Sequence, residues 1–122
     1  MGIKELEDFL YQETDSEQWH LKHEGELSHF YNKLEKVAFD SGEYYCFDFC
    51  NTLKTDTIGI VRESRYTTIP AHFHKDMELN YIYSGSCTFV IKGKEITMKQ
   101  GDLCILDSNV IHSAVSYKEY GD

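Results

Sequence analysis

The sequence has no long hydrophobic run. Its uninterrupted apolar stretches, such as Phe89 to Ile91, are far shorter than the roughly 20 residues that cross a bilayer. The N-terminus from Met1 to Asp8 is charged and lacks the apolar core of a secretory signal. We therefore expect no membrane partner and a cytoplasmic location.

Basic residues are also scarce. The 12 Lys and Arg residues stand against 21 Asp and Glu residues, which gives a net charge of -9 over 122 residues. Such an acidic surface repels phosphate backbones, so we expect these residues not to bind nucleic acid by themselves. No G-x-S-x-G, phosphate loop or dinucleotide fingerprint occurs, so no serine nucleophile or nucleotide site can be identified.

Cysteine is present four times, but never in a C-x-x-C pair. Cys46, Cys50, Cys87 and Cys104 lie in apolar, strand-like runs. In a reducing compartment such cysteines act as small buried hydrophobes. We expect four reduced, buried thiols rather than a disulfide framework or a cysteine metal site.

The remaining pattern divides near residue 42. Over residues 1–42, apolar residues recur at helical spacing, first between Ile3 and Leu10 and again between Leu27 and Val37. Thr14 to Glu17 has the capping-box pattern of a helix start. These features predict an N-terminal segment of two or three short α-helices. Short helices are marginal alone, so this segment must dock on the rest of the domain.

Residues 43–122 have the pattern of a mainly β structure. Aromatic and β-branched runs alternate with turn residues every roughly 8–12 positions, which favours a sandwich or barrel. The expected strands are Tyr44 to Phe49, Ile58 to Tyr66, Thr67 to Phe73, Glu78 to Tyr83, Cys87 to Ile91, Glu95 to Met98, Leu103 to Leu106 and His112 to Ser116. Lys92-Gly93-Lys94 is a tight hairpin signal. The aromatic residues between Tyr44 and Phe49 are interpreted as core and sheet surface.

One group of residues could carry chemistry. On an extended strand His72 and His74 project from the same face, and Glu78 keeps that parity across a short connection. His112 lies on a later strand of the same predicted barrel. Three imidazoles and one carboxylate that converge inside a barrel predict a site for a divalent metal such as Fe, Mn, Ni, Cu or Zn.

The same residues also fit a metal-free pocket. Asn80 shares the strand face of Glu78 and would add an amide to that pocket. Buried imidazole and carboxylate groups need hydrogen-bond partners, and they can serve one another or a ligand's hydroxyl groups. The alternatives at this point are a metal centre and a polar lining for a small molecule.

The spacing of these residues resembles the cupin family. Its first motif has H-x-H, three or four residues, E, six residues and G, which matches His72 through Gly85. Its second motif runs from a Gly to a His eleven positions on, which matches Gly101 to His112. This chain departs from the family pattern at four positions. The family usually has Gly at the positions of Tyr66 and Asn109, Pro at the position of Asp107 and Asn at the position of Ser116. The resemblance implies a small cupin-type β-barrel, and Asn109 suits the left-handed turn that Gly would occupy.

A narrower resemblance is to the N-terminal effector-binding domain of AraC-type transcriptional regulators. It rests on Glu78-Leu79-x-Tyr81 followed by Gly85, on Gly101-Asp102-Leu103 and on His112-Ser113. It implies a domain that binds a small effector, often a sugar, and that dimerises. DNA would be bound only by a C-terminal helix-turn-helix domain, expected beyond residue 122. No catalytic residue is then expected; the alternative is a stand-alone, metal-dependent cupin enzyme, a dioxygenase or isomerase.

The strand that carries Glu78 is apolar on its other face. Leu79, Tyr81 and Tyr83 alternate with the residues that face the pocket. An apolar outer face needs cover from another sheet, from the N-terminal helices or from a partner chain. We expect a homodimer.

Overall fold

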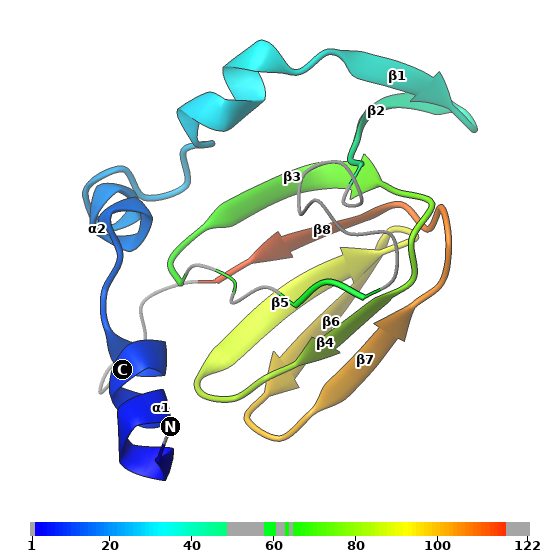
Figure 1. The fold of residues 1–122 in the computed structure, drawn as a ribbon. Helices are drawn as coiled ribbons and strands as arrows, with labels where there is room; N and C mark the ends of the chain where they lie inside the picture. The colour runs from blue at the N-terminus through cyan, green and yellow to red at the C-terminus, as the bar shows by residue number, and fades with distance from the viewer. Residues whose placement is uncertain (1, 49–57, 61–62, 64, 117–122) are drawn as a thin grey trace.

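The computed structural model describes residues 2–48, 58–60, 63 and 65–116 (Figure 1). The described chain is mainly β, with short helices before the strands, as the sequence predicts. None of the helices in these ranges has the length and apolar character of a membrane span.

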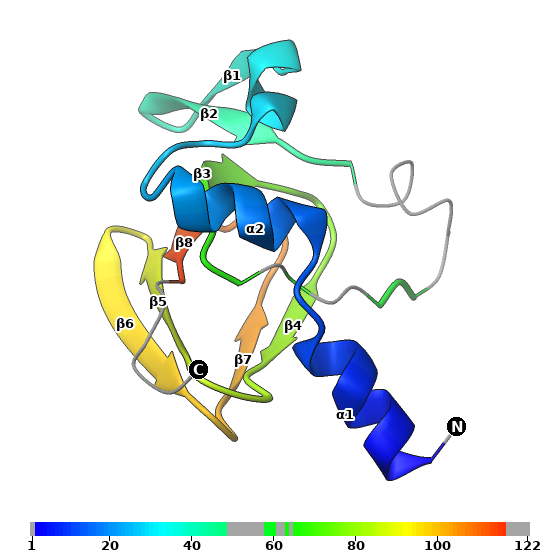
Figure 2. The same cartoon turned by 90° about the vertical axis from the view of Figure 1, so that its left-hand side faces the viewer.

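The N-terminal segment begins with two short α-helices and a 3-10 turn. Helix α1 spans Ile3–Tyr11, α2 spans Asp15–Lys22 and η1 spans His29–Lys33. The predicted capping box at the start of α2 is confirmed, because Thr14 accepts from the Glu17 amide and Glu17 accepts from the Thr14 amide. Figures 1 and 2 place α2 beside one end of β3 (Thr68–Phe73) and β8 (His112–Val115).

The helix predicted from the apolar residues between Leu27 and Val37 is wrong in its C-terminal half. Only η1 is helical there, and Lys36–Phe39 forms strand β1, which pairs with β2 (Gly42–Cys46) as an antiparallel hairpin. The apolar residues of this stretch are spaced as in a helix, but the stretch pairs with β2 and therefore forms a strand. The strand region therefore begins before residue 43.

The strands form two sheets. The larger sheet has six strands in the order β1-β2-β3-β8-β5-β6, and the smaller has two, β4 and β7. The remaining bounds are β4 Glu78–Tyr81, β5 Ser86–Ile91, β6 Lys94–Lys99 and β7 Leu103–Leu106. Figures 1 and 2 both show the β4/β7 pair facing β5 and β6, so the two sheets enclose an interior between them.

The strands predicted from Thr67 onward are confirmed to within about two residues, but a strand from Ile58 to Tyr66 is not. Residues 58–60, 63 and 65–66 of this stretch are not in a strand, and residues 61, 62 and 64 lie outside the described residues. Arg65 and Tyr66 form a turn in which Tyr66 has a φ of 66°. A left-handed residue cannot continue a strand, which explains the difference.

Two turns confirm the sequence prediction in detail, and a third was not predicted. Lys92 and Gly93 have φ values of 51° and 78°, the paired left-handed conformation of a two-residue hairpin turn. Asn109 has a φ of 60°, as its tolerance of that region predicts. Tyr66 also adopts a positive φ, at the other position where a Gly is usual, although its aromatic side chain is buried.

The apolar core is small. Phe89, Met98 and Ala114 form its buried centre, and partly buried neighbours, among them Cys87 and Cys104, pack against it. The expectation of buried cysteines holds only in part, because Cys87 and Cys104 are half-buried free thiols and Cys46 is exposed. Cys46 is the last residue of β2. Cys50 lies outside the described residues.

Candidate functional site

Three buried histidines meet in the interior. His72 and His112 are directly opposite one another across the β3–β8 ladder, and His74 follows the end of β3. One ring nitrogen from each lies within 4.8 Å of the others, and the three side chains are only 1–4% exposed. The structure therefore brings together the three histidines that the sequence singled out.

Local backbone features set these positions. The β3–β8 register shifts between Ile69 and His72, and Pro70, which has no amide hydrogen to give to a ladder, lies within this irregularity. At the other end of β3, the Asn109 amide donates to the His74 carbonyl at 2.7 Å. The left-handed turn at Asn109 thus ties His74 to the loop that leads into His112.

Each histidine makes the same kind of contact through Nδ1. The Nδ1 atoms of His72, His74 and His112 lie 2.7–2.8 Å from the carbonyl oxygens of Pro70, Asp76 and Val110. A carbonyl can only accept, so Nδ1 carries the hydrogen in all three rings. A neutral ring then presents the lone pair of Nε2, which is the arrangement that orients metal-ligating histidines in proteins.

Glu78, the first residue of β4, completes the predicted group. Its Oε1 lies 3.2 Å from Nε2 of His74, and its Oε2 lies 3.8 Å from Nε2 of His112. Asn80 donates to Oε2 at 2.8 Å, so the predicted pocket amide is also present. Two lone pairs cannot face each other at 3.2 Å without repulsion. A proton on either of these two atoms, or a cation between them, satisfies this geometry.

The electrostatics agree with this description. Burial, and then the neighbouring His112, lowers the pKa of His72 to about 4, and burial also lowers the pKa of His112. Burial acts against charge on His74 as well, but its contacts with Glu78 and Asp76 outweigh it and raise its pKa. For Glu78 burial is likewise outweighed, by the hydrogen bonds of His74 and Asn80, and its pKa falls to about 2. Two rings are held neutral, while His74 and Glu78 favour their charged forms.

Aromatic rings from η1, from β2 and from the residue just after β2 extend this site. Phe47 stacks on His72 with ring centroids 4.4 Å apart, and Tyr31 of η1 lies 6.1 Å from Phe47 and 5.3 Å from Tyr45. The parallel pairing of β2 with β3 sets Tyr45 beside His72. The interpretation of the Tyr44 to Phe49 aromatics as core and sheet surface missed this contact with the histidines.

Sequence reasoning also missed Glu63. The residue is exposed, but desolvation of its carboxyl, and then the charge of Glu78, raises its pKa. Burial and the charge of Glu63 together raise the pKa of Tyr31 to about 12. Glu63 is therefore electrostatically linked to both the Glu78 carboxylate and η1. No spacing rule identifies it, because it belongs to neither motif.

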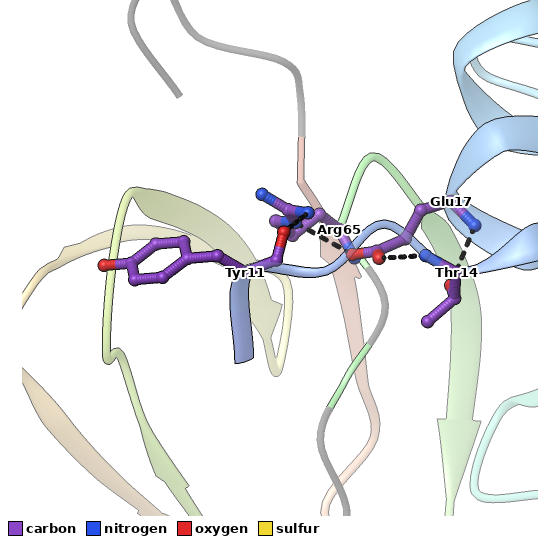
Figure 3. Close-up of polar contacts among 4 residues, drawn as sticks. All are labelled: Tyr11, Thr14, Glu17 and Arg65. Atoms are coloured by element: carbon purple, nitrogen blue, oxygen red, sulfur yellow. Dashed lines mark hydrogen bonds and ion pairs between the residues drawn. The ribbon is translucent and has the colours of Figure 1, made fainter. Parts of the chain in front are cut away.

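A second polar cluster fastens the N-terminal segment to the start of β3 (Figure 3). Glu17 is fully buried and accepts from the Arg65 amide at 2.7 Å and from Arg65 Nε at 2.9 Å. Arg65 also donates to the carbonyl of Tyr11 at 3.0 Å. We call this cluster of Tyr11, Thr14, Glu17 and Arg65 the Glu17–Arg65 clamp. It joins the α1–α2 connection to the turn that precedes β3, the strand that carries His72.

The residues present fit a divalent transition metal. Three buried imidazoles with Nε2 directed at one another, each oriented by a carbonyl, and one adjacent carboxylate form a suitable mixed nitrogen and oxygen donor set. Nε2 of His112 is buried without a hydrogen-bond partner among the described residues. The same atoms can instead accept hydrogen bonds from a ligand's hydroxyl groups, with Asn80 and Glu78 beside them.

The comparisons with known proteins identify one family. A family model described as the AraC-like ligand binding domain matches residues 56–120, more than half of the chain. The matched range contains all four residues of the histidine and carboxylate cluster. Searches of curated proteins and of solved structures gave no significant match.

Proposed function

Because the chain belongs to the family of AraC-like ligand-binding domains, which have a cupin-type fold, we propose that it is the effector-sensing domain of an AraC-type transcriptional regulator. The observation that carries the proposal is the cluster of three buried histidines, His72, His74 and His112, with the half-buried Glu78, inside the matched range. A polar cluster enclosed by two sheets is where a small ligand would be held.

The proposed effector is a small, polar molecule rich in hydroxyl groups, such as a sugar. Nε2 of His72 and His112 can accept hydrogen bonds, and Glu78 offers two acceptor oxygens. Asn80 supplies a polar amide, and the Phe47 ring supplies an apolar surface beside His72. Burial of the two histidines makes a missing partner costly, so a ligand that lacks hydroxyl groups should bind poorly.

The proposed mechanism is a shift between arrangements of the N-terminal segment. Phe47 and Tyr31 connect His72 with η1, and the Glu17–Arg65 clamp connects α2 with the start of β3. An effector that binds one arrangement more tightly will raise its population. In the complete regulator, this shift would change how a homodimer presents a separate helix-turn-helix domain to DNA.

In this proposal the chain senses a ligand and catalyses no reaction. We further propose that the cluster can hold a divalent metal such as Zn, Ni, Mn or Fe, on the evidence of the three oriented histidines. A bound ion would polarise a ligand oxygen as a Lewis acid. A metal-loaded cluster is the basis of a second candidate function, a stand-alone metal-dependent enzyme, which turnover of a substrate by the metal-loaded chain would distinguish from sensing.

The effector proposal is tested by calorimetric titration with a panel of monosaccharides and small polar acids. We expect one class to bind, and His112→Gln to weaken that binding by at least about tenfold, since it removes a buried acceptor. His23→Gln is the matched control, because His23 stacks on Trp19 in the N-terminal segment, away from the cluster. Equal weakening in both variants would contradict the assigned site.

The metal proposal is tested separately by titrating the metal-free chain with Zn²⁺ or Ni²⁺. We expect one ion per chain, and an affinity lowered by about 10- to 100-fold in Glu78→Gln, the scale of a disturbed ligand shell. Glu24→Gln, an exposed change in the N-terminal segment, is the control. No stoichiometric binding by the wild-type chain would end the metal proposal and leave the effector proposal in place.

A further inference from the structure

The buried face of helix α2 is polar. Its two buried residues, Glu17 and His20, lie one turn apart and are 0% and 4% exposed. Residues three positions apart share one side of a helix, so this is the side that faces the end of β3 and β8 (Figure 2). A surface helix ordinarily docks through an apolar stripe, whose contacts do not depend on pH. The docking of α2 depends instead on two ionisable groups.

The two buried groups differ in how their polar atoms are satisfied. Glu17 accepts three hydrogen bonds, from the amides of Thr14 and Arg65 and from Arg65 Nε (Figure 3). Nδ1 of His20 is buried and has no hydrogen-bond partner among the described residues. A neutral ring can leave one nitrogen as an unused acceptor, whereas a protonated ring carries a hydrogen on both nitrogens and a positive charge. Burial of a charge without an acceptor is far more costly, so the docked helix favours neutral His20.

The groups around His20 do not offset that cost. The ionisable side chains around the docked helix come from four places: Glu17 and His23 of α2, Glu13 of the α1–α2 connection, His29 of η1 and Arg65 of the turn before β3. The Glu17 carboxylate is already paired with the Arg65 guanidinium, which is itself a cation. Burial, and then the charge of His23, lowers the pKa of His20 below its ordinary value of 6.5. The surroundings therefore add to the preference for the neutral ring.

We propose that helix α2 is a pH switch, which stays docked while His20 is neutral and detaches when His20 binds a proton. The detached helix exposes His20 to water, which removes the cost of its charge. Protons therefore bind the detached form more tightly than the docked form, and acidification below pH 6.5 raises the population of the detached form. A single titrating group can change the ratio of the two forms by at most about tenfold for each pH unit.

The switch would act on the attachment of the whole N-terminal segment. Glu17 lies on the same side of α2 as His20, so the Glu17–Arg65 clamp opens when the helix detaches. Helix α2 is followed by η1, which carries Tyr31 against Tyr45 and Phe47. A proton would thus be a second input to the domain, taken up by a residue outside the histidine and carboxylate cluster. This goes beyond the proposed effector function and does not need an effector to bind.

The single tryptophan of the chain reports on this helix. Trp19 meets the ring of His20 edge-on with centroids 4.9 Å apart, stacks on His23 at 4.1 Å and meets His29 of η1 at 5.4 Å. Nδ1 of His23 lies 2.8 Å from the Trp19 carbonyl oxygen, so this nitrogen carries a hydrogen. A second proton on His23 would place a cation over the indole face, which is a favourable contact. Protonation of His23 therefore does not by itself detach α2, in contrast to protonation of His20.

The test follows the fluorescence of Trp19 and the hydrogen exchange of the full chain between about pH 7.5 and 5, without effector or metal. In the wild type we expect the emission to move to longer wavelength, and the protection factors of α2 amides to fall by up to about tenfold for each pH unit below 6.5. At every pH these amides should be less protected than those of β5, whose exchange requires the buried core to open.

Two variants remove the titrating group. His20→Gln keeps a polar side chain and His20→Leu places an apolar one on the docked face, and neither can be protonated. Both should keep α2 protected down to about pH 5. His23→Gln is the matched control, because it leaves His20 in place and should retain the loss of α2 protection seen in the wild type.

Several outcomes would overturn the inference. A pH response that persists in both His20 variants would assign it to another group, such as Glu17, and a response lost in His23→Gln would assign it to His23. Equal protection of α2 and β5 would mean that the helix opens only when the whole domain unfolds. A helix already detached at neutral pH in both His20 variants would show that the ring, rather than its neutrality, holds α2. Because no effector is present, failure of the switch leaves the effector proposal in place, and a chain that binds no effector can still show the switch.

Discussion

Replacing the fully buried Glu17 by Gln tests how the N-terminal segment is held. Gln keeps the side-chain shape and can still serve the capping box at the start of α2. It removes the charge that strengthens three hydrogen bonds, one from the Thr14 amide and two from Arg65. The NH₂ group of Gln would also take the place of one carboxylate oxygen. It would then face an N–H donor that this oxygen accepts from in the wild type, and two donors cannot form a hydrogen bond.

The magnitude follows from these contacts. A hydrogen bond to a charged group contributes about 1.5–3 kcal/mol, compared with about 1 kcal/mol for a neutral pair. The Arg65 side chain is 27% exposed, so water partly compensates its guanidinium and the loss stays below that of a fully buried ion pair. We expect Glu17→Gln to lower the free energy of unfolding by about 2–3 kcal/mol, and Tm by roughly 10 °C.

Urea denaturation of the wild type, Glu17→Gln and the exposed control Glu24→Gln measures this difference. Hydrogen exchange should show lost protection in α2 before β5 and β6, because the clamp holds that helix to the start of β3. A Glu17→Gln chain within about 0.5 kcal/mol of the wild type would refute the reasoning. So would a loss of protection that begins in β5.

Two further predictions concern the turn and the titrating groups of the site. Asn109→Gly should change stability by only a few tenths of a kcal/mol, whereas Asn109→Val should lower it by about 1–2 kcal/mol at a φ of 60°, measured by the same denaturation; equal effects would contradict the turn argument. The pKa of His72 is lower in the folded chain than its ordinary value. As the pH is lowered from 6.5 to about 4, the unfolded chain therefore binds a proton at this residue before the folded chain does. The free energy of unfolding decreases by roughly 3 kcal/mol across that window. The raised pKa of His74 opposes part of this loss, and His72→Gln should flatten the dependence; an unchanged profile in that variant would assign it to other groups.

Much of the site could be predicted from the sequence because strand geometry is periodic. The parity of His72, His74 and Glu78 predicts that these three side chains share one face, and the second motif of the cupin resemblance adds His112. Turn residues were equally readable, since Lys92-Gly93 and Asn109 tolerate the positive φ that their turns require. Apart from the position of His112, these features depend on neighbours within a few residues.

The rest depends on contacts that no local pattern encodes. The capping box identified Glu17 as a helix-start residue, but not its partner Arg65, 48 positions further along the chain. Phe47 meets His72 only because β2 pairs in parallel with β3. Strand β1 was not predicted because the spacing of its apolar residues is typical of a helix. Only its pairing with β2, which the local sequence does not reveal, makes it a strand.

The central claim is that the histidine cluster binds the effector through Nε2. Nitrogen-15 NMR of the imidazole rings, recorded with and without each member of the ligand panel, tests it most directly. The account predicts that His72 and His112 of the free chain carry their hydrogen on Nδ1, and that a binding ligand shifts their Nε2 signals while those of His23 stay unchanged. A ligand that binds by calorimetry yet leaves both Nε2 signals in place, or a free chain with its hydrogens on Nε2, would contradict the claim.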